Sequence, residues 1–178
     1  NSGIRGILAY PEVYRWVREA LGLNRWLQRY VEQYVKPREG DRILDIGCGT
    51  GEIVRYLRGT TYVGVDHHHP YIDYAMRVFG NRGRFICADV ADHIDTFRGE
   101  FDLVIANGVL HHLDDALATK LFHIGAMVLS EGGRMVTVDP CYYEGQACAT
   151  RFIISNDRGQ NVRQFEDYAR LAGNAFST

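Results

Sequence analysis

The sequence predicts an α/β fold in which helices cover both faces of a mostly parallel sheet. From residue 40 onward, short apolar runs alternate with segments of helical periodicity, as expected for consecutive strand–helix units. The first run passes abruptly into alternating glycines, the pattern of a buried strand that turns into a helix beside a ligand. Several later runs end in an acid or an amide, at the strand ends where ligands bind in open sheets.

The alternation of apolar runs and helical patterns defines the expected elements. We expect strands at residues 42–46, 61–66, 84–88, 101–106 and 134–139. We expect helices at residues 51–58, 70–79, 91–97, 115–129 and 163–172. Residues 155–163 are polar and predict a surface loop.

Two helices are expected before the first strand. Pro11 suits a first helical position, and residues 13–21 repeat apolar side chains at helical spacing. A second apolar face begins at Trp26 and ends before Pro37. We expect the aromatic side chains of both helices to pack in the core. The alternative is that the first helix, together with Tyr10, covers a ligand as a lid.

Composition narrows the class of protein. A chain of 178 residues with 46% apolar and 24% charged residues predicts one globular domain with a sizeable core. No apolar stretch approaches the length of a membrane span, and no secretion signal is visible at the start. The net charge of −2 and the pI of about 6.4 disfavour a nucleic-acid partner.

The four cysteines form no framework along the chain. Their scatter predicts reduced thiols and therefore a cytoplasmic location. They also lack the close spacing that would hold an iron–sulfur cluster. His67, His68 and His69 invite a metal-site interpretation, but three consecutive histidines cannot all face one ion, so we expect no metal.

The most specific motif is the sequence ILDIGCGTGE at residues 43–52. A dinucleotide-binding fingerprint would place its third glycine at position 52, where this chain has Glu52, so a nicotinamide oxidoreductase ranks third among the alternatives. The spacing G-x-G-x-G instead resembles the cofactor loop of class I S-adenosylmethionine-dependent methyltransferases. Four further segments follow in that family's order, within roughly residues 40–140: TYVGVD, RFICADV, FDLVIANGVLHHL and LSEGGRMV.

The resemblance implies a Rossmann-like, doubly wound sheet that binds S-adenosyl-L-methionine and releases S-adenosyl-L-homocysteine. It divides the single domain 1–178 into amino-terminal helices at 1–36, a cofactor-binding core at 40–140, and an acceptor-side loop and last helix at 141–178. The family usually ends with two further strands, which this sequence does not contain, so we expect either that the sequence is a fragment or that another chain or segment covers the edge of the fifth strand. We expect the isolated chain to self-associate through that edge or to be fragile.

The cofactor residues implied by the resemblance lie in the glycine loop and at the strand ends. Asp45 would meet the methionine ammonium group, and Asp66 the ribose hydroxyls, with a helix N-cap as the alternative for Asp66. The full set is Asp45, Gly47, Cys48, Gly49, Thr50, Gly51, Asp66, His67, Asp89, Val90 and Asn107.

Candidate acceptor residues follow the fourth and fifth strands. His111 and His112 are the candidates for a general base, because histidine titrates near neutral pH; the alternative is a hydrogen bond within the fold. Asp139, Tyr142 and Tyr143 either face the acceptor or pack in a loop. Cys141 follows Pro140, but after the fifth strand, and is interpreted as an ordinary thiol.

The function expected from these features is methyl transfer to an oxygen or nitrogen of a small molecule. The segment after the fourth strand lacks the Asn/Asp-Pro-Pro-aromatic motif of enzymes that methylate base amines. The alternative is a cofactor-binding module without turnover of its own, completed or regulated by a partner. The identity of the acceptor cannot be predicted, because specificity belongs to the site rather than the fold.

Overall fold

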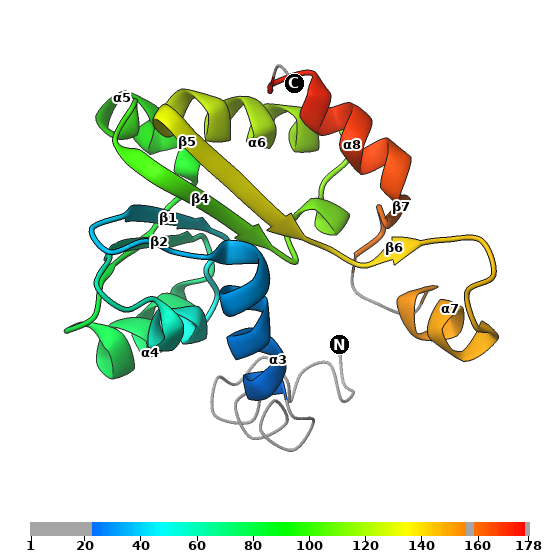
Figure 1. Cartoon of the computed structure of the whole chain (residues 1–178), viewed down its shortest axis with the longest axis horizontal. Coiled ribbons are helices and arrows are strands. Elements are labelled where there is room, and N and C mark those ends of the chain that lie inside the picture. The colour runs from blue at the N-terminus through cyan, green and yellow to red at the C-terminus, as the bar shows by residue number, and fades with distance from the viewer. Residues whose placement is uncertain (1–22, 156–158, 177–178) are drawn as a thin grey trace. The chain divides into compact units, whose positions relative to one another are not determined.

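The computed structural model describes residues 23–155 and 159–176, which belong to two compact units, residues 1–89 and 90–178. The expected first helix, with Tyr10 and Pro11, lies outside the described residues. The five long strands are β1 (Arg42–Ile46), β2 (Thr61–Asp66), β3 (Arg84–Cys87), β4 (Phe101–Asn107) and β5 (Leu129–Val138), and their order in the sheet is β3-β2-β1-β4-β5. The α/β, Rossmann-like fold predicted from the sequence is confirmed (Figure 1). The division into a single domain 1–178 stays a prediction.

The described part of the first unit begins with a helix whose inner face is buried. Helix α3 (Leu23–Tyr30) continues into a π-helical turn, η1 (Val31–Val35), which ends at Lys36 in a left-handed conformation before Pro37. The buried side chains of this segment are Leu27, Tyr30, Val31 and Val35. The expectation of a fully packed aromatic face is wrong in part, because Trp26 and Tyr34 stack on Tyr30 from the outside and remain exposed.

Three parallel strands form the sheet of the first unit. They are β1 (Arg42–Ile46), β2 (Thr61–Asp66) and β3 (Arg84–Cys87), and the pairs β1–β2 and β2–β3 are parallel. Helix α4 (His69–Phe79) packs against β2 and β3. The helix expected at 51–58 is instead a short 3₁₀ helix, η2 (Glu52–Tyr56), because left-handed Gly51 delays its start and leaves room for little more than one turn.

The second unit pairs β4 (Phe101–Asn107) in parallel with β5 (Leu129–Val138). Strand β5 begins five residues before the expected position 134, because the glycines at 132 and 133 form an irregularity within the strand rather than a turn before it. The helix expected at 91–97 is divided into a 3₁₀ helix, η3 (Val90–His93), and a single turn, α5 (Ile94–Phe97).

The second unit has a long helix that packs against β5 and a last described helix that packs against the long one. Helix α6 (Asp115–Val128) is capped by the Asp114 side chain, which accepts a hydrogen bond from the Leu117 N–H at 2.8 Å. Helix α8 (Phe165–Gly173) lies beside α6, as Figure 1 shows. Between β5 and α8, the described residues form short elements that the sequence did not predict: β6 (Cys141–Tyr142), α7 (Cys148–Ser155) and β7 (Arg163–Gln164), with β6 and β7 paired in parallel.

Candidate functional site

The glycine loop after β1 has the open backbone that a ligand-binding turn requires. Gly47, Gly49 and Gly51 all have positive φ, between 54° and 71°, a region that favours glycine. A Cβ on Gly49 would meet no atom within 4 Å, so its surroundings are open. A Cβ on Gly51 would lie 2.6 Å from the Phe85 ring, so this glycine is required by packing.

Asp66, at the end of β2, is hydrogen-bonded to the glycine loop. Its Oδ2 accepts a hydrogen bond from the Gly49 N–H at 2.8 Å, and its Oδ1 accepts one from the His68 N–H at 2.8 Å. The N-cap position of α4 is His68 rather than Asp66. The carboxylate therefore ties the loop to the start of the helix without occupying the cap position that the sequence offered as an alternative.

Asp45 lies beneath the loop and is buried with Tyr62. The Tyr62 hydroxyl donates a hydrogen bond to Oδ2 of Asp45 at 2.7 Å, and both side chains are at most 3% exposed. Burial raises the pKa of Asp45 to about 7, the Tyr62 hydrogen bond opposes that rise, and the negative charge of Asp66 adds to it. Burial also raises the pKa of Cys48 far above its usual value, so this thiol stays neutral.

The remaining cofactor candidates of the first unit differ in exposure. Thr50 is buried in the loop, whereas the His67 side chain is 91% exposed and Asp89 is exposed after β3. His69 pairs with Asp73, one turn further along α4, at 2.9 Å. Among the described residues, no group of three or more His, Cys, Asp or Glu side chains could hold a metal ion.

In the second unit, the two candidate histidines occupy different environments. His111 is buried, and its Nδ1 lies 2.6 Å from Oδ1 of Asp139, which also accepts the His111 backbone N–H at 3.1 Å. A ring that donates through Nδ1 has Nε2 as its basic atom. His112 is exposed and packs against His111 with the rings tilted by 39° and their centroids 4.0 Å apart. Oδ2 of Asp139 is buried and has no hydrogen-bond partner among the described residues.

Two further candidates of the second unit, Val90 and Asn107, lie at element ends. Val90 is buried at the start of η3, and Asn107 is half-buried at the end of β4. Tyr142 lies in β6, and the guanidinium carbon of Arg151 lies over the tyrosine ring, 5.3 Å from the ring centroid. Tyr143 is exposed. The sequence placed these tyrosines correctly after the fifth strand, and a role toward an acceptor stays a prediction.

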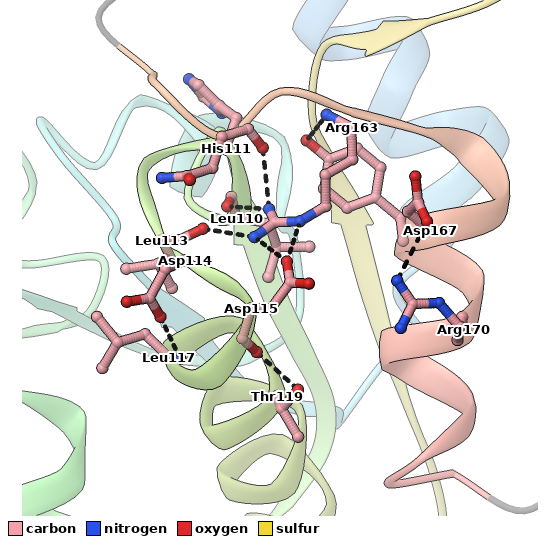
Figure 2. A network of polar contacts seen from close by, with 12 residues as sticks. Leu110, His111, Leu113, Asp114, Asp115, Leu117, Thr119, Arg163, Asp167 and Arg170 are labelled. Carbon is pink, nitrogen blue, oxygen red and sulfur yellow. Dashed lines mark hydrogen bonds and ion pairs between the residues drawn. The ribbon is translucent and has the colours of Figure 1, made fainter.

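Arg163 is a buried residue that the sequence did not single out. Its guanidinium donates hydrogen bonds to the carbonyl oxygens of Leu110 and Leu113, at 2.9 and 2.7 Å, and to Asp115 at 2.9 Å (Figure 2). A third carbonyl, of Asn161, accepts at 3.0 Å. The arginine therefore holds both ends of the 3₁₀ helix η4 (Leu110–His112).

Residues 159–163, which we name the strap, also cover His111 directly. The Asn161 N–H donates to the His111 carbonyl oxygen at 3.0 Å. A Cβ on Gly159 would overlap the His111 ring carbon Cδ2 and lie 2.7 Å from the same carbonyl oxygen. His111 thus contacts both Asp139 and the strap. The polar pattern of residues 155–163 predicted a loop, but nothing in it indicated this contact.

No helix among the described residues has both the length and the apolar character needed to cross a membrane. All four cysteines are free thiols.

Comparison with known proteins identifies a family for this site. A family model for a methyltransferase domain matches residues 43–133, which are 91 of the 178 residues. Phosphoethanolamine N-methyltransferase 1 of Zea mays is 27% identical over 96% of this chain and 34% of its own length. Probable tRNA methyltransferase 9B of Homo sapiens is 36% identical over 60% of this chain and 23% of its own length.

Solved structures share the fold. Phosphoethanolamine N-methyltransferase 2 of Haemonchus contortus, in complex with S-adenosyl-L-methionine, has a TM-score of 0.69 at 20% identity, over 85% of this chain and 36% of that one. A TehB-like SAM-dependent methyltransferase of Corynebacterium glutamicum has a TM-score of 0.68 at 21% identity, over 96% of this chain and 83% of that one.

The chain spans 34% and 23% of the length of the two curated relatives described above. The family match nevertheless covers the glycine loop, Asp45 and Asp66 of the first unit and His111 of the second. Together with the strand order, it shows that the chain belongs to the methyltransferase domain family, of the class I S-adenosylmethionine-dependent type.

Proposed function

We propose that this chain transfers a methyl group from S-adenosyl-L-methionine to an oxygen or nitrogen of a small molecule. The observation that carries the proposal is the glycine loop of the first unit. At Gly49 a side chain would meet open space, while two carboxylates, Asp45 and Asp66, lie next to the same loop. A positively charged, hydroxyl-rich cofactor requires such a combination of close backbone approach and hydrogen-bond acceptors.

In this proposal, Asp45 meets the cofactor's ammonium group and Asp66 accepts hydrogen bonds from the ribose hydroxyls. The loop residues Gly47 to Gly51 line the cofactor, and His67, Asp89, Val90 and Asn107 complete the proposed set. The bound cofactor supplies an activated methyl group on a sulfonium. The protein's own contribution is to orient the reactants and exclude water, which can lower a barrier by roughly 7–11 kcal/mol.

A nitrogen acceptor is supported by the relatives named phosphoethanolamine N-methyltransferase. In the second unit, His111 is the candidate base, because its contact with Asp139 orients the ring with Nε2 as the basic atom. His112 is the exposed alternative. A relative named as a probable tRNA methyltransferase raises an RNA acceptor as a rival, which the net charge of −2 does not favour.

Calorimetric titration with S-adenosyl-L-homocysteine and, separately, with NAD tests the cofactor. We expect micromolar binding of S-adenosyl-L-homocysteine alone. Failure of the folded chain to bind it would contradict the proposal, and preference for NAD would revive an oxidoreductase function. Transfer of labelled methyl groups to phosphoethanolamine, other small amines and alcohols, and tRNA then tests the acceptor. Cofactor binding without transfer to any of them would favour a binding module completed by a partner.

Two proposals concern the chain's surroundings. Strand β5 stands at the end of the strand order, and we propose that the isolated chain self-associates through this edge. A monomer in light scattering, together with high thermal stability, would contradict this. We also propose a cytoplasmic location, which the four free thiols support.

A further inference from the structure

Tyr62 is a buried residue of β2 to which the function proposed above assigns no role. Its side chain is 2% exposed and packs against Phe85, with ring centroids 5.6 Å apart. A buried tyrosine usually requires a hydrogen-bond partner for its hydroxyl. Here the partner is Oδ2 of Asp45, at 2.7 Å, a carboxyl oxygen of the proposed cofactor site.

The strand register explains how these two side chains meet. In the β1–β2 pair, Asp45 lies opposite Gly64, and Tyr62 precedes Gly64 by two residues on the same face of the strand. Gly64 has no side chain, and a Cβ there would lie 2.8 Å from Sγ of Cys48. The space beside Asp45 is therefore available to the tyrosine hydroxyl and the neutral Cys48 thiol.

The charges that face Asp45 favour its protonated form. Asp66 in β2 is negative, Cys48 in the loop is a neutral thiol, and burial removes the water that would stabilise a carboxylate. Against these influences acts the Tyr62 hydroxyl, which donates a hydrogen bond that an anion accepts more strongly than a neutral acid does. Its deletion should therefore raise the pKa of Asp45 above about 7.

We propose that Tyr62 is a positioning residue for the cofactor: its hydroxyl orients the Asp45 carboxylate and favours the anion that meets the ammonium group of S-adenosyl-L-methionine. The inference rests on the proposed function, because Asp45 has this role only if the cofactor occupies the loop. An ionised, fixed carboxylate binds a cation more tightly than a neutral or mobile one. Tyr62 thereby extends strong cofactor binding down to neutral pH.

The test measures the affinity for S-adenosyl-L-homocysteine from pH 6 to pH 9 in wild type and in Tyr62→Phe. If the hydroxyl lowers the pKa of Asp45 by roughly one unit, the size of one charge-assisted hydrogen bond, Tyr62→Phe should bind about fivefold more weakly at pH 7. The deficit should approach tenfold at pH 6 and fall below about twofold at pH 9, where Asp45 is ionised in both proteins. Tyr74→Phe is the matched control, because Tyr74 is a buried tyrosine of the same unit on α4.

Two measurements do not depend on the ligand affinity of the variant. Carbon NMR of the carboxyl groups, with Asp45 assigned from Asp45→Asn, should show its titration midpoint shifted upward in free Tyr62→Phe. In wild type, calorimetry in buffers of different ionisation enthalpy should show release of nearly one proton on binding at pH 6 and almost none at pH 8, below the pH at which the ligand's own ammonium group loses its proton.

The outcomes separate this inference from the proposed function. Wild-type binding with a pH-independent deficit in Tyr62→Phe, or with none, overturns the role of Tyr62 and leaves the cofactor assignment intact. An unchanged Asp45 midpoint in Tyr62→Phe, or no proton release by wild type at pH 6, overturns it as well. Absence of wild-type binding at every pH overturns the proposed function and this inference together.

Discussion

Asp45 in the first unit and Arg163 in the second are both buried charged side chains, but their surroundings differ in kind. Arg163 donates to three backbone carbonyls and to Asp115, so its guanidinium is surrounded by acceptors. Asp45 has a tyrosine hydroxyl and a neighbouring negative charge, and its pKa is raised to about 7. A buried ion that its own protein satisfies stabilises a structure, whereas one left short of positive partners is suited to a cationic ligand.

The largest expected effect is the loss of Arg163. In Arg163→Met, the carbonyl oxygens of Leu110 and Leu113 lose their donor, and we expect the free energy of unfolding to fall by about 3 kcal/mol. Urea denaturation followed by circular dichroism measures it. Arg170→Met is the control, because Arg170 pairs with Asp167 on the exposed surface of α8 and should cost less than about 0.5 kcal/mol. An equal loss of unfolding free energy in both variants would contradict the expected difference between the buried and the exposed arginine.

At Asp45, in contrast, we expect a substitution to raise the free energy of unfolding. Its folded-state pKa of about 7 lies above the usual 3.8, so the folded protein holds a proton that the unfolded chain releases between these values. Stability therefore falls as pH rises from about 4 to 7 and the penalty persists above pH 7. Asp45→Asn removes the ionisation and should stabilise the protein by about 2 kcal/mol at pH 8, roughly half of what the pKa difference is worth because the amide is itself a buried polar group, with little effect at pH 4.

Thermal unfolding of Asp45→Asn at both pH values measures this gain, and titration with S-adenosyl-L-homocysteine should show weaker binding by the same variant. Asp73→Asn, at an exposed carboxylate of α4, is the control. A variant that is destabilised at pH 8 would show that Asp45 contributes to the fold rather than costing stability.

Asp66 should affect the ligand more than the fold. Asp66→Ala removes the proposed ribose partner and the acceptor for the Gly49 and His68 N–H groups, so S-adenosyl-L-homocysteine should bind more than tenfold more weakly, about 1.4 kcal/mol. Calorimetry of the folded variant gives the value, with Asp73→Ala as the control. Unchanged affinity in a folded variant would refute the ribose assignment.

The smallest effect is expected where the strap meets His111. Gly159→Ala places a methyl group against the His111 ring and should cost about 1 kcal/mol of unfolding free energy. Gly173→Ala, where a Cβ meets nothing within 4 Å, should be neutral or slightly stabilising. Urea denaturation gives the free energy of unfolding of both variants. An unchanged value in Gly159→Ala would mean that the strap can move to accommodate the methyl group at no cost in stability.

The sequence predicted best where burial alone determines the structure. Strands β1 and β2 begin and end as expected, because a parallel strand that is buried on both faces is a short, largely apolar run. The start of β5 was placed too late, because glycines at 132 and 133 read as a turn although the sheet accommodates them as an irregularity. Helix α7 is amphipathic over only eight residues, too short for a clear periodic signal.

The candidate site, like the fold, was predicted from the sequence only in part. The glycine loop and Asp66 were found from spacing, since backbone approach to a ligand requires particular residue types at particular positions. Arg163 was missed because its acceptors are mainly carbonyl oxygens, which leave no trace in the side-chain sequence. Tyr62 was placed in its strand, but its contact with Asp45 depends on the register between β1 and β2, which the sequence does not state.

The Arg163 contacts bear on how this protein can be diversified. Every amino acid presents a carbonyl oxygen, so an anchor that binds carbonyls tolerates a change of side chain at the residues it holds. Half-buried Leu113, whose carbonyl Arg163 holds, and exposed His112, which lies between the two held carbonyls of Leu110 and Leu113, can therefore be exchanged while the turn stays in place. A library randomised at these two positions should consist largely of folded members, which makes this turn a practical starting point for selecting new acceptor preferences.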